Sequence, residues 1–150
     1  TAPGERVSVD QITSPTPGFI AQMVGQLTSK RYTCATIFVN NATGYGYVWL
    51  QTTTLASETL QEKEAFEREA NDAGIEIEEY RADNGIFKSK HWVSICVRGR
   101  QRLSFCAANA HYQNNHAESL ARLLRQLARR SLSHAVIQCL YSSVTYRLKI

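Results

Sequence analysis

The sequence lacks the short motifs by which many enzymes are recognised. It has no Gly-rich phosphate loop and no Ser-His-Asp arrangement, so neither a P-loop enzyme nor a serine hydrolase is indicated. Although 43% of its 150 residues are hydrophobic, no run approaches the roughly 20 apolar residues that a membrane-spanning helix needs. No internal repeat is present. We therefore expect one globular domain and no membrane partner.

The cysteines also lack the spacing of a metal site. The chain has four of them: Cys34, Cys96, Cys106 and Cys139. They form no C-x2-C pair, and neither His111 nor His116 has a cysteine partner at zinc-site spacing, so a structural zinc ion is not expected. The first three cysteines lie in apolar segments, which favours buried free thiols over disulfides. Free thiols indicate a reducing compartment, so we expect the protein in the nucleus or the cytoplasm.

Acidic residues are almost missing from the second half of the chain. Residues 84–150 contain eleven Lys or Arg and a single carboxylate, Glu118, whereas residues 1–83 contain six Lys or Arg and twelve Asp or Glu. The two parts carry charges of +10 and −6, which give the net charge of +4. A basic half of this kind indicates nucleic-acid binding, although the pattern is not specific.

Hydrophobic periodicity predicts alternating strands and helices. Pro15 and Pro17 are expected to end the first strand, because proline donates no hydrogen bond to a sheet, and a loop should follow to about Arg31. Ser57 is the candidate cap and Gly74 the candidate stop of the first helix. The expected strands span residues 6–11, 32–40, 45–53, 75–82 and 102–106, and the expected helices span residues 55–73, 89–97 and 115–133.

The first predicted helix is amphipathic. One side of its helical wheel carries mostly apolar residues: Leu55, Thr59, Phe66, Ala70 and Ala73. The acidic residues spread over the rest of the wheel: Glu58, Glu62, Glu69 and Asp72.

This order of elements predicts an α/β fold with a mixed five-stranded sheet flanked by helices. The early strands form a meander through a turn at residues 41–44, and the later strand–helix–strand connections are expected to be parallel and right-handed. We assign residues 1–134 to one domain. Residues 135–150 alternate only weakly and are left as a tail of unclear structure. The first residue is Thr rather than Met, which indicates a piece of a longer chain.

Three carboxylates lie at predicted element boundaries. Asp10 ends the first apolar run, Asp83 ends a later strand, and Glu118 opens a helix. Together they can hold two Mg²⁺ ions, because oxygen ligands suit this hard cation, and two such ions can clamp the oxygens of a phosphoryl displacement. Taken alone, each acid has a simpler explanation, as a turn former at a strand end or as an acid that interacts with the helix dipole.

The helix after Glu118 carries a stripe of arginines. At about 100° per residue, the three arginines Arg122, Arg125 and Arg129 lie within about 40° of Glu118. Leucines occupy the opposite face and are expected to anchor the helix: Leu120, Leu123, Leu124 and Leu127. A solvated charged face usually mixes both signs, but no acid follows Glu118. We therefore favour phosphate contacts for these arginines over a merely solvated face.

Five stretches of the chain resemble the catalytic core of retroelement integrases, in particular those of copia-type retrotransposons. They are residues 7–11 (Val-Ser-Val-Asp-Gln), 36–40 (Thr-Ile-Phe-Val-Asn), 63–67 (Lys-Glu-Ala-Phe-Glu), 81–85 (Arg-Ala-Asp-Asn-Gly) and 109–118. The last stretch is the most specific, because the family has a Gln-Asn pair, here Gln113 and Asn114, shortly before its catalytic glutamate. The resemblance covers about residues 6–134.

The resemblance implies a ribonuclease H-like fold and a catalytic, metal-binding triad of Asp10, Asp83 and Glu118, with two Mg²⁺ or Mn²⁺ ions. The implied reactions are trimming of the element's DNA ends and joining of their 3′-hydroxyls to target DNA. The family has basic residues one and two turns after the glutamate, and such cores are homodimers or higher oligomers. The predicted DNA-binding residues are Arg122, Arg125, Arg129, His111, Gln113 and Asn114.

Two other interpretations stay open. The chain has 34 residues between its second and third acids, where the family usually has 35, and the sequence after His134 does not resemble the family. A copy that has lost catalysis but still binds DNA would explain the odd tail, although all three acids are intact. A ribonuclease H-type nuclease normally uses a fourth acid, for which the basic half offers no candidate.

Overall fold

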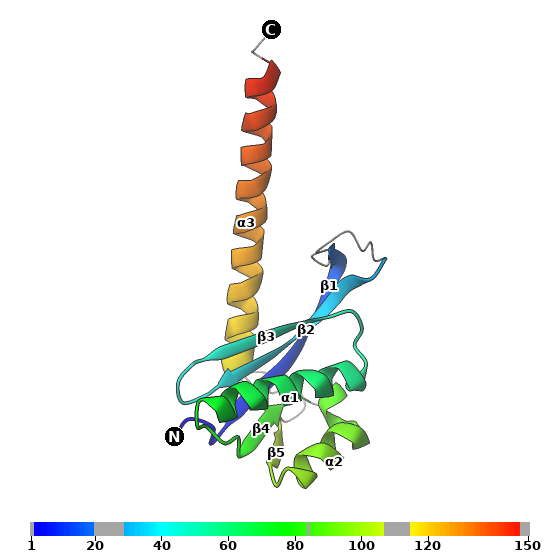
Figure 1. The fold of residues 1–150 in the computed structure, drawn as a ribbon, viewed down its shortest axis with the longest axis vertical. Coiled ribbons are helices and arrows are strands. Elements are labelled where there is room, and N and C mark those ends of the chain that lie inside the picture. Colours follow the sequence, from blue (N-terminus) through cyan, green and yellow to red (C-terminus); the bar gives the residue numbers. More distant parts are fainter. Residues whose placement is uncertain (1, 20–28, 84, 107–114, 148–150) are drawn as a thin grey trace.

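A computed structural model describes residues 2–19, 29–83, 85–106 and 115–147. Its centre is a five-stranded sheet with helices on both faces (Figure 1). The strands are β1 (Val7–Phe19), β2 (Arg31–Asn40), β3 (Gly46–Gln51), β4 (Glu79–Ala82) and β5 (Arg102–Phe105). The helices are α1 (Ala56–Asp72), α2 (Lys90–Arg98) and α3 (Asn115–Arg147), with a short 3₁₀ turn at Ile86–Lys88.

The sheet is mixed, as the sequence predicts. Its strand order is β3-β2-β1-β4-β5, with β1, β2 and β3 antiparallel and β1, β4 and β5 parallel. Helix α1 connects β3 to β4, and α2 connects β4 to β5. Val9 of β1 is paired with Ala82 of β4, so the residues that follow them lie next to each other, although β1 continues and β4 ends there. Within the described ranges, no helix is both long and apolar enough to cross a membrane.

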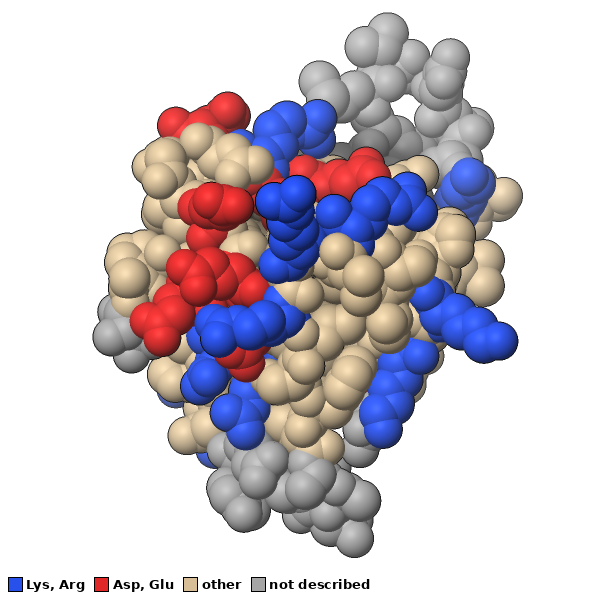
Figure 2. All heavy atoms as spheres, turned by 90° about the horizontal axis from the view of Figure 1, so that it is seen from below, with Lys and Arg blue, Asp and Glu red and all other residues tan. Residues whose placement is uncertain are grey.

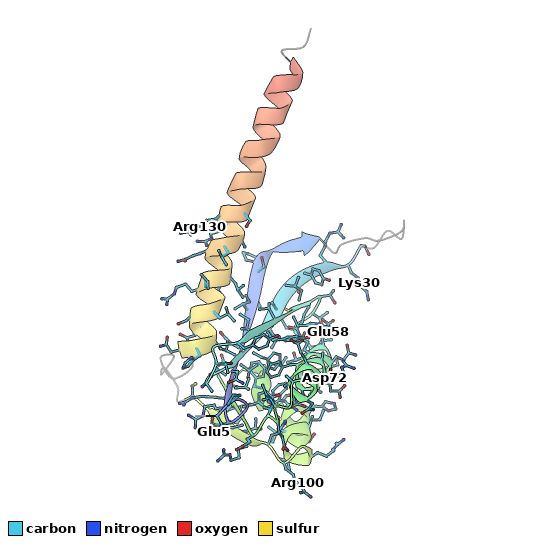
Figure 3. The ribbon with its side chains drawn as sticks, turned by 60° about the vertical axis from the view of Figure 1, so that its left-hand side comes forward. Glu5, Lys30, Glu58, Asp72, Arg100 and Arg130 are labelled. Carbon is cyan, nitrogen blue, oxygen red and sulfur yellow. The ribbon has the colours of Figure 1, made fainter. Side chains whose placement is uncertain are left out.

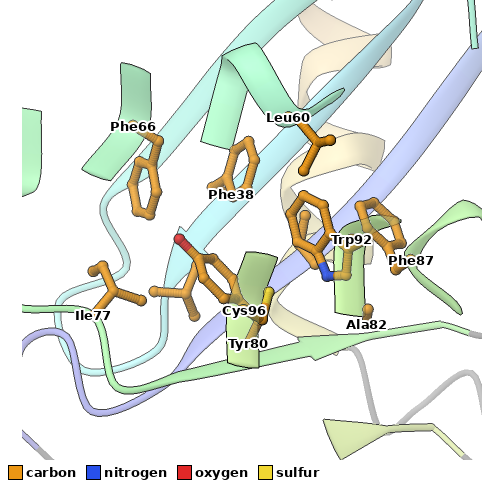
Figure 4. Packing of buried hydrophobic residues seen from close by; sticks show 11 residues of the cluster. Phe38, Leu60, Phe66, Ile77, Tyr80, Ala82, Phe87, Trp92 and Cys96 are labelled. Carbon is orange, nitrogen blue, oxygen red and sulfur yellow. The ribbon is translucent and has the colours of Figure 1, made fainter. Parts of the chain in front are cut away.

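The main hydrophobic core lies between the sheet and helices α1 and α2 (Figure 4). Phe38 of β2 stacks on Phe66 of α1 with ring centroids 4.8 Å apart, and Tyr80 meets Trp92 edge-on at 5.7 Å. A smaller cluster joins α3 to the other face of the sheet: Ile37, Val39, Ala117 and Ala121. Because each large buried side chain contributes about 1.5–3 kcal/mol, the main core supplies most of the apolar stabilisation.

The thiols in the described part of the chain are buried and free, which confirms the prediction for Cys34, Cys96 and Cys106. Burial raises the pKa of Cys96 to about 11, with Lys63 lowering it and Glu67 raising it to a lesser degree. This thiol is therefore protonated at neutral pH and behaves as a small apolar side chain.

Strand β1 is longer than predicted. It continues through Pro15 and Pro17 to Phe19, pairing with β2 again at its end, and its register shifts between Thr13 and Gly18, where the prolines lie. After its first three residues, β1 pairs with β2 alone among the described residues. A proline in this segment can face the unpaired side without removing a ladder hydrogen bond, so the prolines distort the strand instead of ending it.

Helix α1 differs from the prediction at its start and on its buried face. It begins at Ala56, its N-cap residue is Leu55, and Ser57 provides no side-chain cap. Gly74 does end the helix, in the left-handed conformation with φ +74°. Leu55, on the apolar side of the predicted wheel, is exposed, whereas Glu62, off that side, is fully buried. The helical wheel alone cannot show which residues are buried, because the strands beneath α1 present polar side chains to it.

The buried polar surface beneath α1 is formed by Gln11 of β1, Thr36 of β2 and Gln51 of β3. The side-chain oxygen Oε1 of Gln51 accepts hydrogen bonds from the side chains of Gln11 and Thr36, and its Nε2 donates to the Thr59 hydroxyl of α1 at 3.0 Å. Glu62 lies beside this network, yet neither of its carboxylate oxygens has a hydrogen-bond partner among the described residues. Burial raises the pKa of Glu62 to about 8, with the nearby Thr36 hydroxyl lowering it and the Glu58 carboxylate raising it.

Helix α3 does not end at Ser133 as predicted but continues to Arg147, with no glycine or proline to interrupt it. It crosses one end of the sheet and then projects away from it (Figure 1). Leu120 and Leu124 pack on the sheet, but Leu123 and Leu127 are 49% and 47% exposed. Only two of the four leucines predicted to anchor the helix therefore do so, because only the first turns of α3 lie over strands. The assignment of residues 135–150 to a separate tail stays a prediction.

An ion pair lies buried where α1 meets β4 and the segment before β5. Lys63 Nζ is 2.7 Å from Oε1 of Glu67, and the Tyr80 hydroxyl donates to the same oxygen at 2.7 Å. The Gln101 amide also donates to Glu67. The Lys63 side chain is 2% exposed, so the Glu67 carboxylate balances a charge that has almost no access to water.

Replacing Glu67 with Ala is expected to lower the free energy of unfolding by about 2–4 kcal/mol, because it leaves the Lys63 ammonium group buried without a counter-charge. Urea denaturation at pH 7 measures this change. The matched control is Glu64→Ala, at an exposed position of the same helix, which should cost less than about 0.5 kcal/mol. Equal effects of the two substitutions would contradict the role given to Glu67.

Candidate active site

Asp10 lies on β1 directly after the buried Val9, and Asp83 follows β4 directly after Ala82. Because Val9 and Ala82 are paired across two parallel strands, the two aspartates that follow them lie side by side, with Asp10 inside β1 and Asp83 just beyond the end of β4. Asp10 is half-buried, and its Oδ1 accepts a hydrogen bond from the Gln11 backbone N–H at 2.8 Å.

Glu118 reaches the same region from the first turn of α3. Ala117 and Ala121 are buried against β2, and their small side chains allow the helix to lie close to the strands. Gly46 serves the same approach from β3, because a Cβ added there would lie 2.3 Å from Cδ2 of Leu120. The close packing of α3 on the sheet is what positions Glu118.

The structure brings four predicted site residues to one pocket of about 360 Å³. Two are the acids Asp10 and Glu118, and two are the basic residues Arg122 and Arg125. The other lining residues are Asn115, Ser119 and Ala121. Carboxylates and guanidinium groups thus share one cavity, an arrangement suited to a ligand that carries both a metal ion and phosphate groups.

The acids in this region repel one another. The pKa of Asp10 is raised to about 6, first by burial and then by the carboxylates of Asp83 and Glu118, while the Gln11 backbone N–H and Arg125 lower it. The Asp10 carboxyl therefore interacts electrostatically with both of the other acids. A bound cation would relieve this repulsion, so the charge arrangement fits a divalent ion.

Asp83 is the one of the three acids that does not line the pocket. Its Oδ1 accepts a hydrogen bond from the Gly85 backbone N–H at 3.1 Å, in the turn after β4. Within the described ranges, no three His, Cys, Asp or Glu side chains stand close enough to form a complete metal-binding group. The chemistry of the ligands therefore fits a metal ion better than their present spacing does.

The remaining predicted residues divide into two groups. Arg129 lies on the exposed part of α3, beyond the pocket lining. The loop residues His111, Gln113 and Asn114 lie outside the described residues.

Sequence reasoning gave no pocket role to Ser119, whose hydroxyl donates to Oδ1 of Asn115 at 3.1 Å. Its position one residue after Glu118 was the only signal, and a serine in the first turns of a helix often makes only local hydrogen bonds.

Comparison with known proteins gives structural neighbours but no sequence relatives. No protein-family model matches the chain, and no curated protein matches its sequence. A chain of the simian T-cell lymphotropic virus intasome, in complex with PP2A regulatory subunit B56 gamma, matches with a TM-score of 0.67 and 14% identity, over 88% of this chain and 42% of that chain. The HTLV-2 integrase catalytic core domain in complex with magnesium, in dimeric and trimeric forms, matches with a TM-score of 0.60 and 16% identity. These matches cover 88% of this chain and 74% of the HTLV-2 chain.

These neighbours establish the class of fold. The mixed sheet with helices on both faces is the ribonuclease H-like fold, and its structural neighbours are retroviral integrase catalytic cores. The chain spans less than half the length of the intasome chain that it matches.

Proposed function

We propose that this chain is the catalytic core of a copia-type retroelement integrase, which trims the element's DNA ends and joins their 3′-hydroxyls to target DNA. The observation that carries the proposal is the single pocket that Asp10 and Glu118 share with Arg122 and Arg125. These residues come from the first strand and the last helix of a ribonuclease H-like fold, and they combine the ligands of a metal ion with the ligands of a phosphodiester.

The acids are assigned to metal binding and catalysis. Asp10, Asp83 and Glu118 would hold two Mg²⁺ or Mn²⁺ ions, which lower the pKa of the attacking water or 3′-hydroxyl and stabilise charge on the leaving oxygen. Asp10 is the central ligand in this assignment, because its carboxyl interacts with both of the other two. Asp83 would have to release the Gly85 N–H or share its oxygen to take part.

The arginines are assigned to DNA phosphates. A guanidinium group binds phosphate through two parallel hydrogen bonds, and Arg122 and Arg125 stand beside the acids on consecutive turns of α3. Arg129 would extend this track along the helix, which leaves the sheet past Arg130 (Figure 3). Contacts from His111, Gln113 and Asn114 are part of the proposal as sequence predictions.

The proposed protein acts as a homodimer or higher oligomer inside the cell, in the nucleus or the cytoplasm. The HTLV-2 core domains, which occur as dimeric and trimeric forms, support the first statement by analogy of fold. The buried free thiols are consistent with a reducing compartment.

A second function, DNA binding without catalysis, is favoured by one observation. Asp83 is hydrogen-bonded within its own turn and stays outside the lining of the pocket, as expected if the triad no longer works as a unit. The basic pocket and helix would still bind DNA in such a protein.

Strand cleavage and rejoining on a branched DNA substrate distinguishes the two functions. Product is expected with Mg²⁺ or Mn²⁺ and none with a chelator, because the reaction depends on the ions that the acids hold. Thermal unfolding with and without Mg²⁺ provides a readout other than activity, since an ion bound only by the folded state raises Tm. Absence of product from folded protein that Mg²⁺ stabilises would overturn the enzyme and support the DNA-binding function.

Replacing both Arg122 and Arg125 with Ala is expected to weaken DNA binding about tenfold or more and to reduce the slope of log affinity against log salt by about 2, since each phosphate contact contributes about 0.9. Fluorescence anisotropy at several salt concentrations measures both. Arg68→Ala is the control, because Arg68 is exposed on α1, across the sheet from the pocket. An unchanged salt slope in the double variant would mean that the arginines are merely solvated.

A further inference from the structure

Strand β3 presents an apolar outer edge. It is the last strand of the sheet and, within the part of the chain that is described, it pairs only with β2. Large apolar side chains along it are 38–53% exposed: Tyr45, Val48, Trp49 and Leu50. Exposed apolar edges of this kind are association sites, because their outer N–H and C=O groups can pair with another strand.

The register shows which backbone groups face outward. The Asn40 N–H donates to the Tyr45 carbonyl at 2.9 Å, which makes these two residues a hydrogen-bonded pair of the antiparallel ladder. Such pairs alternate along the ladder, so the N–H and C=O of Val48 point away from β2. The side chains of Tyr47 and Trp49 lie on the α1 face of β3, with ring centroids 6.3 Å apart.

A pocket of about 370 Å³ opens at the start of this edge. Phe66 and Ala70 of α1 and Ile77 form much of its apolar wall, and Tyr45 and Glu69 stand at its rim, where the Tyr45 hydroxyl donates to the Glu69 carboxylate. The volume is enough for one large apolar side chain. Glu69 is the one charged residue among the nine that line this pocket.

Charge at this surface favours a basic partner. Helix α1, which packs against β3, has six acidic residues against Lys63 and Arg68. Glu62 is buried and Glu67 is paired with Lys63, which leaves Glu58, Glu64, Glu69 and Asp72 against Arg68. Figure 3 shows Asp72 at the end of α1, well away from Arg130 of α3, and Figure 2 shows acidic side chains gathered toward one side of the face seen from below. The acidic residues of α1 and the arginines of α3 therefore lie on opposite faces of the sheet.

We propose that the outer edge of β3 and the adjoining pocket bind an extended basic peptide segment of a partner protein. The peptide pairs with β3 as an added strand, places one apolar side chain in the pocket, and presents a Lys or Arg to Glu69. A second copy of this chain is a poorer occupant. Antiparallel pairing of two β3 strands would bring two α1 helices to one face of the joined sheet, where their negative charges repel.

The probe is an acetylated, amidated peptide, Lys-Val-Lys-Phe-Lys-Val-Lys, compared with the peptide in which every Lys is replaced by Glu. Trp49 is 41% exposed and Trp92 only 1%, so a blue shift of tryptophan fluorescence reports binding at β3. The basic peptide is expected to shift the emission and the acidic peptide to leave it unchanged. Glu69→Lys should weaken binding of the basic peptide by about tenfold.

The strand-pairing step is tested by Val48→Pro, which removes an outward N–H without touching the ladder to β2 and so leaves the fold intact. It should weaken binding by at least about tenfold. Val48→Thr keeps the N–H and is the matched control that should bind as the unaltered protein does. Equal urea midpoints for the two variants establish that both are folded.

Equal binding of the acidic peptide, or unchanged binding by Val48→Pro, would overturn the proposal. So would a concentration-dependent dimer that Val48→Pro dissociates while the basic peptide fails to bind, because the occupant would then be a second copy. Strand cleavage and rejoining should be the same in Val48→Pro and Val48→Thr. This inference and the proposed function therefore stand or fall separately.

Discussion

Glu118→Gln is expected to abolish strand cleavage and rejoining, with a loss of about a thousandfold or more, while the protein stays folded and binds DNA as before. The amide has the shape of the carboxylate but no charge, so it is a much weaker ligand for Mg²⁺. Arg122 and Arg125 remain in the pocket, which is why DNA affinity should be kept. Product formation on branched DNA and salt-dependent DNA binding are the two measurements.

The control for this substitution is Glu76→Gln, at an exposed position between α1 and β4. It removes the same charge from the chain and should leave activity unchanged. Activity that survives in Glu118→Gln would show that the glutamate is not a catalytic ligand. A joint loss of folding and DNA binding would show that Glu118 acts in the packing of α3.

Glu62→Gln is expected to stabilise the protein, and to do so more strongly as the pH rises. The pKa of Glu62 is about 8 in the folded state and near its ordinary value of 4.5 when unfolded. The folded state therefore holds a proton that the unfolded state releases. Glu62 therefore costs the fold nothing below pH 4.5, and its destabilising contribution grows as the pH rises to about 8.

The amide cannot ionise, so the variant avoids this loss. The difference in the free energy of unfolding should be small at pH 4.5 and reach about 4 kcal/mol at pH 8, since each unit of pKa shift is worth about 1.4 kcal/mol. Urea denaturation at both pH values measures this difference. The pH-dependent contribution of Asp10 cancels, because both proteins contain this residue. Glu64→Gln, exposed on the same helix, should show no such pH dependence. A difference that is the same at pH 4.5 and pH 8 would rule out ionisation of Glu62 as the cause.

The sequence predicted the strands and the sheet well because their signals are local. β-branched and aromatic runs gave β2 and β3, and the change of period gave α1. The same local rules failed where the partner of a residue decides the outcome. Pro17 is tolerated because β1 has an unpaired side there, and Glu62 is buried because Gln51 and Thr36 provide polar neighbours. The unpaired side of β1 and the polar neighbours of Glu62 both depend on contacts between distant parts of the chain, so the local sequence does not reveal them.

The candidate site was predictable to a similar extent. Asp10 and Glu118 meet in one pocket with two arginines, as their grouping in the sequence predicted. Glu118 does lie at a helix start, but β1 continues past Asp10 instead of ending there. Their catalytic and metal-binding roles stay predictions. The hydrogen bond of Asp83 to Gly85 was not anticipated, although Asn-Gly after a strand is a turn signal in which an aspartate side chain often takes part.

The order in which this pocket can be completed follows from its chain positions. Asp10 lies on the first strand, and Glu118, Arg122 and Arg125 lie on the last helix. During synthesis the sheet can begin to form while α3 is still missing, because chains emerge from their N-terminus. Such a partial chain has two aspartates side by side but neither the third acid nor the arginines. The cavity therefore arises only in the finished fold, and a product truncated before α3 should neither gather these charged groups nor act on DNA through them.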